Sequence, residues 1–189
     1  MKFPRIAVLS LAGLWACNAY AAGDARGFIH RWRVFEPMAV QGRLTEPAVQ
    51  DALRANPSPD ANAAGWHTVD NPAYNLNLYH FATGLSKPTS NVLFWITTVV
   101  DAPQEMPDVR LAIGSNAASR WWLNDELVIA LNDDRQTVID DGVSRRLTLH
   151  KGRNVIRAAV INGGGATDFC ARFLDANDKP ITTLRVNLP

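Results

Sequence analysis

The chain has 189 residues, of which 47% are hydrophobic and 20% charged, and its 19 basic and 18 acidic side chains give a formal net charge of +1. This balance argues against nucleic acid or an anionic lipid surface as a partner, because both bind through a clear excess of basic residues. Beyond the N-terminal region no stretch is long and apolar enough to match the roughly 20 residues that cross a bilayer, so no transmembrane span is expected.

The N-terminal segment shows the order of features that is typical of a secretory signal peptide. Lys2 and Arg5 supply positive charge, residues 6–15 form a short apolar run, and the small-residue pattern Ala19-Tyr20-Ala21 follows. We expect cleavage after Ala21, so that the mature chain begins at Ala22 and is periplasmic or secreted. Its length suits a single domain that extends to the last residue.

The two cysteines have different expected fates. Cys17 leaves with the signal peptide, unless the segment Leu14-Trp15-Ala16-Cys17, which is similar to a bacterial lipobox, directs its lipidation instead. The bulky Trp15 fits a lipobox poorly, so lipidation is the minor alternative. Cys170 then has no partner for an internal disulfide. It is expected as a free thiol on the less buried side of its strand, opposite the set Phe169, Ala171 and Phe173.

The first half of the mature chain contains few regular elements. Residues 28–35 alternate apolar and polar side chains in the manner of a strand, which ends at Glu36-Pro37. Residues 42–74 are rich in Pro, Asn, Ala and Asp and are expected to be largely irregular. One short helix is predicted within them, near residues 46–55, because Thr45 can act as its N-cap and Pro47 falls in its first turn.

The second half of the chain is a succession of short strands, each rich in β-branched and aromatic residues and bounded by turn-forming residues. These runs cover residues 91–100, 109–113, 119–123, 126–131, 144–149, 153–161, 169–174 and 181–188. Asn124-Asp125 is expected to form a tight hairpin turn, and Gly163-Gly164-Gly165 a hairpin loop. Together the segments predict an all-β fold, an antiparallel jelly-roll β-sandwich with one short helix.

Several phrases within residues 108–181 carry a family resemblance. They are Leu111-Ala112-Ile113-Gly114-Ser115, Trp122-Leu123-Asn124-Asp125-Glu126-Leu127-Val128, Leu147-Thr148-Leu149-His150-Lys151-Gly152-Arg153-Asn154, and Asn162-Gly163-Gly164-Gly165 with Ala171-Arg172-Phe173-Leu174-Asp175. In order and spacing this segment resembles the galactose-binding-like jelly-roll domains, similar to carbohydrate-binding modules, that are attached to exported bacterial enzymes. The resemblance implies a sandwich whose outer faces and end loops are available for binding, but it names no ligand.

The residues that usually carry catalysis do not form a recognisable set. There is no Gly-x-Ser-x-Gly elbow, and the histidines lack the paired spacing of metal ligands: His30, His67, His80 and His150. The chain is therefore expected to be no enzyme and to need no cofactor. One alternative is calcium, which takes carboxylate ligands and could use the acidic residues that flank one loop. These are Asp133, Asp134, Asp140 and Asp141; a solvated loop is the simpler interpretation.

The aromatic residues are the strongest candidates for a binding site. Strand alternation places Trp121 with Leu123 toward the core, and Trp122 with Arg120 on an outer face. An indole there could stack on a sugar ring or enter a pocket of a protein partner, and an arginine beside it could add a cation–π contact or a hydrogen bond. The alternative is that a loop of the same domain covers Trp122. Three aromatic residues belong to the segment that could supply either the cover or the site: Trp66, Tyr74 and Tyr79.

These features favour a function in binding. The first hypothesis is an exported accessory subunit that docks on a larger periplasmic or membrane-anchored enzyme, for example an oxidoreductase complex. The alternative is a carbohydrate-binding protein that uses exposed aromatic residues. A glycoside hydrolase or esterase is the least favoured, because no nucleophile–base pair is evident.

Overall fold

The computed structural model describes residues 21–22, 25–40 and 45–189 of the chain. The predicted signal sequence up to Tyr20, and the lipobox-like cysteine Cys17 within it, lie outside these residues. Export and lipidation therefore stay predictions. None of the helices in the described ranges is long and apolar enough to cross a membrane.

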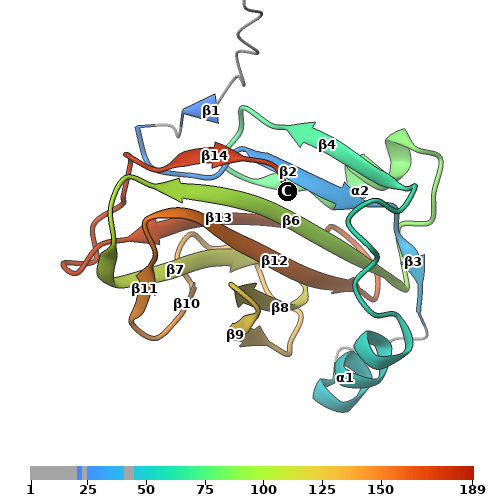
Figure 1. The fold of residues 1–189 in the computed structure, drawn as a ribbon. Coiled ribbons are helices and arrows are strands. Elements are labelled where there is room, and N and C mark those ends of the chain that lie inside the picture. Colours follow the sequence, from blue (N-terminus) through green and yellow to red (C-terminus); the bar gives the residue numbers. More distant parts are fainter. Residues whose placement is uncertain (1–20, 23–24, 41–44) are drawn as a thin grey trace, which may run out of the picture.

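The described chain forms two antiparallel β-sheets that face each other (Figure 1). The larger sheet is ordered β1-β14-β6-β12-β8-β9; β2 and β3 also pair with β6, and β4 pairs with β2. Its strands are β1 (Ala21–Ala22), β2 (Arg31–Phe35), β3 (Met38–Ala39), β4 (Trp66–Asp70), β6 (Val92–Ala102), β8 (Ala118–Leu123), β9 (Glu126–Leu131), β12 (Gly152–Asn162) and β14 (Arg185–Asn187). The smaller sheet contains β5 (Leu76–Asn77), β7 (Met106–Ser115), β10 (Gly142–Val143), β11 (Leu147–Leu149) and β13 (Asp168–Leu174). The prediction of an all-β antiparallel sandwich is confirmed.

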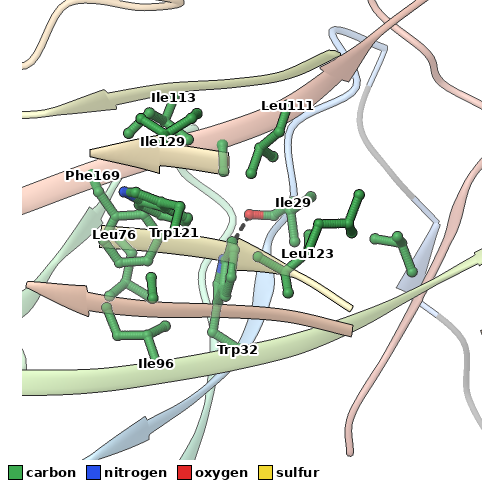
Figure 2. Packing of buried hydrophobic residues seen from close by; sticks show 14 of the residues in the cluster. Ile29, Trp32, Leu76, Ile96, Leu111, Ile113, Trp121, Leu123, Ile129 and Phe169 are labelled. Carbon is green, nitrogen blue, oxygen red and sulfur yellow. Dashed lines mark hydrogen bonds between the residues drawn. The ribbon is translucent and has the colours of Figure 1, made fainter. Parts of the chain in front are cut away.

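The main core lies between the two sheets and is built around three aromatic side chains (Figure 2). The rings of Trp32, Trp121 and Phe169 meet edge to face, with centroids 6.2 Å apart for the two indoles and 5.1 and 5.4 Å for the contacts with the phenyl ring. The Trp32 indole N–H donates to the Ile29 carbonyl at 2.9 Å, so its one polar atom is satisfied in the interior. Trp121 and Leu123 both point into this core, as strand alternation predicts.

A second group of apolar side chains lies on the opposite, outer face of the larger sheet. Trp95 of β6 is its largest buried member, and it alternates with core residues such as Phe94 and Ile96 along the same strand. We call this group the outer cluster, and its buried members are Val40, Val49, Ala52, Leu93, Trp95, Ala118, Ala159 and Ile161.

Helix α1 (Glu46–Ala55) covers the outer cluster. It lies where the sequence predicts a helix, with Thr45 in extended conformation at its N-cap and a proline in its first turn. Val49 and Ala52 are its buried residues, and the Trp95 indole N–H donates to the Asn56 carbonyl just beyond its end at 3.1 Å. The helix therefore closes part of a face that would otherwise be solvent-exposed.

Some short elements lie where the sequence suggested no regular structure, and β4 and α2 are the longest of them. β4 runs within the segment expected to be irregular and pairs along its whole length with β2, from Arg31 opposite Asp70 to Phe35 opposite Trp66. α2 (Leu78–Gly84) is a second short helix, whose N-cap Asn77 accepts a hydrogen bond from the His80 N–H at 2.8 Å. Both are short, and β4 depends on a partner strand distant in sequence.

One of the two predicted hairpin connections is confirmed. Asn124 and Asp125 join β8 to β9 with φ angles of +49° and +69°, which is the left-handed pair that matches the twist of a two-residue hairpin. The prediction of a hairpin loop at residues 163–165 is wrong, because this glycine run joins β12 of the larger sheet to β13 of the smaller sheet and the two strands do not pair.

Candidate functional site

Trp122 lies on the outer face of the larger sheet, as its alternation with Trp121 predicts, but it is half-buried. Its ring packs against Trp95 at 5.6 Å with an interplanar angle of 31°, and it borders the outer cluster. Its partial cover comes from Trp95, a neighbour on the same sheet face, and not from a loop. Trp122 is therefore at the rim of a small apolar cluster, with part of its indole facing solvent.

Arg120 shares the outer face with Trp122, but it is 1% exposed, which corrects the expectation that it is available to a ligand. Its guanidinium donates to the Leu131 carbonyl at 2.7 Å and to Asn132 Oδ1 at 2.6 Å, and it lies 4.0 Å from the Glu46 carboxylate of α1. Burial lowers the pKa of Arg120 from its ordinary value, and Glu46 partly opposes that shift. The residue is used to join β8, the end of β9 and the helix.

The two candidate tyrosines lie away from the outer cluster and do not belong to one site. Tyr74 packs against Phe28 at 5.6 Å, and the Arg26 guanidinium lies over its ring at 5.6 Å. Tyr79 is on α2, 40% exposed, beside His80. Sequence proximity suggested that they could act with Trp66, but Tyr74 lies in the turn after β4 and Tyr79 lies on α2.

Trp66 lines a pocket on the outer face of the larger sheet, which we call the outer groove. The groove has a volume of about 200 Å³. This is smaller than the roughly 300–1,000 Å³ of a drug-sized ligand site, so it suits one small ring or group. Its lining residues are Arg33, Ser58, Pro59, Ala61, Trp66, Ile96, Thr97, Val155, Arg157 and Pro189.

Strand register explains why these side chains meet. Trp122 lies directly opposite Arg157, Arg157 opposite Thr97, and Thr97 opposite Arg33, in one row across β8, β12, β6 and β2. Residues opposite each other on neighbouring strands share a face, and the strands are about 4.8 Å apart. The two arginines therefore stand on either side of Thr97, with their backbones roughly 10 Å apart.

Each arginine of the groove lies over an indole. The Arg33 guanidinium is 5.1 Å from the Trp66 ring centroid, and the Arg157 guanidinium is 6.0 Å from that of Trp122. Trp66 is held by the bond from its indole N–H to the Asp60 carbonyl at 2.9 Å and by an edge-to-face contact with Phe35 at 5.2 Å. The indoles therefore orient the guanidiniums, and the groove presents arginine edges beside apolar surface.

The four carboxylates considered for calcium do not form a common site. The Arg172 guanidinium donates to the Asp140 carboxylate, with 2.9 Å between Arg172 Nε and Asp140 Oδ1. Asp141 pairs with Arg135. Asp133 and Asp134 are exposed. Across the residues that the structure describes, no group of three or more His, Cys, Asp or Glu side chains is arranged to hold a metal ion.

Cys170 is a free thiol, as predicted, but it is only 2% exposed, whereas the less buried side of its strand was expected. The core-facing set Phe169, Ala171 and Phe173 is confirmed. The loop that contains Val138 accounts for the difference, because this loop and the Cys170 sulfur both lie close to Gly114. A Cβ placed on Gly114 would meet the Val138 carbonyl oxygen at 2.3 Å and the Cys170 sulfur at 3.0 Å. Burial raises the pKa of Cys170 to about 11, so the thiol is neutral near pH 7.

Sequence reasoning missed Arg33 and Arg157. One signal was available. Each arginine lies two residues from an outward-facing residue of the same strand, so alternation places it on the outer face of the sheet. Neither could be assigned to a site, because the sequence does not reveal that β2 and β12 both flank β6.

Comparison with known proteins shows the fold. No protein-family model matches the chain, and no curated protein matches it. Among solved structures, the β-glucosidase from Kluyveromyces marxianus is 18% identical with a TM-score of 0.51; the match covers 82% of this chain and 20% of the enzyme. An anti-sigma factor domain-containing protein is 10% identical with a TM-score of 0.50, over 84% of this chain and 45% of that one.

A PA14 sugar-binding domain from an RTX adhesin is 12% identical with a TM-score of 0.44, over 86% of this chain and 78% of that one. The chain thus spans about a fifth of the β-glucosidase and less than half of the anti-sigma factor protein. At these identities the matches to the β-glucosidase and the anti-sigma factor protein show a shared fold alone.

Proposed function

We propose that this chain is a non-catalytic carbohydrate-binding protein that acts outside the cytoplasm and holds one sugar unit in the outer groove. The observation that carries the proposal is the groove itself, where Arg33 and Arg157 stand on either side of Thr97 on a sheet face that also presents Trp66 and Trp122. We also propose that the sandwich is a galactose-binding-like jelly roll, as the resemblance in the sequence implies.

The groove matches the two kinds of surface that a sugar ring presents. A pyranose has hydroxyl groups at its edge and C–H groups on its faces. Each guanidinium has five N–H donors in a planar fork, which suits neighbouring hydroxyl oxygens. Trp66 and Pro59 offer apolar surface to the C–H groups, and an indole face is negative enough to attract them. The small volume favours a single ring over a long stretch of chain.

Binding without catalysis is the simplest interpretation of this groove. Glycoside hydrolysis needs two carboxyl groups across the sugar, and no acidic residue is among those that line the groove. We therefore expect the purified chain to leave a bound oligosaccharide intact, which chromatography of the sugar after prolonged incubation would check. Appearance of shorter products would contradict this part of the proposal.

The test is a glycan array of neutral and acidic oligosaccharides, followed by titration calorimetry of the sugars that bind. Arg157→Gln should weaken binding several-fold, since one neutral hydrogen bond contributes about 0.5–1.5 kcal/mol, and Trp66→Ala should weaken it because apolar surface is removed. The matched control is Arg110→Gln on β7 of the other sheet, because Arg110 is as exposed as Arg157 and also pairs with one aspartate. Absence of binding to every sugar on the array would refute the proposal.

The accessory-subunit hypothesis has less support. Exposed apolar side chains that a docking surface could use are Leu127, Val138, Ile139 and Val143. None of them is among the residues that line the outer groove. Co-purification of the tagged chain with a stoichiometric enzyme that survives mutation of the outer groove would favour docking over sugar binding.

Export is part of the proposal and has its own measurement. Expressed with its N-terminal segment, the chain should be recovered from the cell exterior or periplasm with Ala22 as its first residue, because Ala-x-Ala precedes that position. Intact-mass analysis decides the matter. A mass that includes residues 1–21, or one that fits a lipidated Cys17, would contradict it.

A further inference from the structure

We infer that the ligand is an oligosaccharide of two or more units, and that the unit next to the one in the outer groove binds to Asp125, Trp122 and Leu127. We call these three residues the hairpin subsite, because they belong to β8, β9 and the turn between them. This inference rests on the proposed function, since it extends the same binding surface and specifies its ligand. It follows from the strand register beyond the groove and from the exposure and contacts of the three side chains.

The row of side chains that crosses the groove continues past Arg157. Within the groove, Thr97 lies opposite Arg157. Beyond it, Arg157 lies opposite Trp122, and Trp122 lies opposite Leu127. Neighbouring strands are about 4.8 Å apart, so the backbone of Leu127 is three strand spacings, or roughly 14 Å, from that of Thr97. Because residues opposite each other share a face, one strip leads from the groove to β9, the last strand on this side of the described sheet.

The strip beyond the groove is apolar and accessible. Leu127 is 48% exposed, and the half-buried Trp122 lies between it and Arg157. A single exposed leucine needs no explanation on a protein surface. Here it adjoins an indole, and both side chains lie on the strip that leads into the groove. Together they offer the C–H groups of a second sugar ring the kind of surface that Trp66 offers the first.

An ion pair joins the groove to the hairpin subsite. Arg157 lines the groove, and its Nη2 atom lies 2.8 Å from Asp125 Oδ1. The Asp125 side chain is 85% exposed, and a carboxylate has about four acceptor positions, so it can accept hydrogen bonds from sugar hydroxyl groups while it pairs with Arg157. Arg157 therefore supplies donors to the unit in the groove, and Asp125 supplies acceptors to the next unit.

The contacts of Arg33 favour extension toward β9 over extension in the opposite direction. The Arg33 guanidinium lies over the Trp66 ring at 5.1 Å and donates to the Ala61 carbonyl at 2.9 Å. Two further residues of the same loop, Ser58 and Pro59, also line the groove. A longer ligand therefore meets this loop near Arg33, whereas accessible apolar and acceptor groups follow one another on the side of the hairpin subsite.

The experiment measures affinity against the length of the ligand by titration calorimetry. Gluco-, galacto-, manno- and xylo-oligosaccharides of one to four units are compared, each as its methyl glycoside so that the end ring stays closed. In a series that binds, we expect the affinity to rise about fivefold or more from one unit to two, because the second unit gains hydrogen bonds at the hairpin subsite. A fourth unit should add less than about twofold, since the strip ends at β9.

Variants locate the effect. Leu127→Ala should remove most of the gain from the second unit and leave the affinity for one unit unchanged, whereas Leu127→Met, which keeps the apolar surface, should retain the gain. The matched control is Val143→Ala, an exposed apolar residue on β10 of the smaller sheet, which should change neither affinity. Asp125→Asn removes the charge and tolerates the left-handed backbone at φ +69°, so it should also reduce the gain. Thermal melting of each variant checks that it is folded.

The outcomes distinguish the hairpin subsite from the proposed function. Binding of one unit with no gain from a second would overturn the hairpin subsite and leave sugar binding in the outer groove standing. A gain that survives both Leu127→Ala and Asp125→Asn would also overturn it, because the second unit would then lie elsewhere. If no oligosaccharide of any length binds, both the inference and the proposed function fail.

Discussion

Replacement of Trp122 by alanine provides a quantitative test of its placement at the rim of the outer cluster. A large aromatic side chain buries roughly 200 Å² when fully enclosed, and burial stabilises by about 25 cal/mol per Å². Trp121 is fully buried, so Trp121→Ala should lower the free energy of unfolding by about 5 kcal/mol. Trp122 is half-buried, so Trp122→Ala should lower it by roughly half as much.

Thermal melting followed by circular dichroism compares the two variants under identical conditions. For a domain of this size each kcal/mol corresponds to about 2–4 °C, so Trp122→Ala should melt roughly 5–10 °C lower and Trp121→Ala about twice as far below wild type. The two residues are adjacent and identical in type, so differences in unfolded-state behaviour largely cancel. Equal losses would show that Trp122 is a core residue, and no loss would show that it does not pack against Trp95.

Three further predictions address groups outside the groove. Arg120→Ala should destabilise the chain by about 3 kcal/mol or more in urea unfolding, because it leaves buried acceptors without a donor; wild-type stability would refute its assigned structural role. Cys170 should resist alkylation at pH 8 in the native state and react fully in denaturant, because burial raises its thiol pKa to about 11; rapid native labelling would contradict that burial. Hydrogen bonds from Lys87 and His67 lower the pKa of Glu36, so its contribution to stability is present above the unfolded-state pKa and lost as the pH falls through the lower folded-state pKa. The melting temperature of Glu36→Gln should accordingly fall less than that of wild type on acidification below about pH 4.5, and identical acid profiles would exclude the effect.

The sequence by itself determined the strands and the direction in which their side chains point. Both depend on interactions between near neighbours: a period of two along each strand, turn residues between strands and an N-cap before the helix. For this reason the opposite faces of Trp121 and Trp122, the hairpin at Asn124-Asp125 and the helix at residues 46–55 are all confirmed.

Only the tertiary structure decided what covers each face and which strands lie side by side. Arg120 is buried because α1 and the end of β9 surround it, and Cys170 because a distant loop crosses its strand. The outer groove exists because β2 and β12 both pair with β6, which places Arg33 and Arg157 on either side of Thr97. Alternation along one strand repeats every two residues and is visible locally, whereas the neighbour of a strand depends on the packing energy of the whole chain.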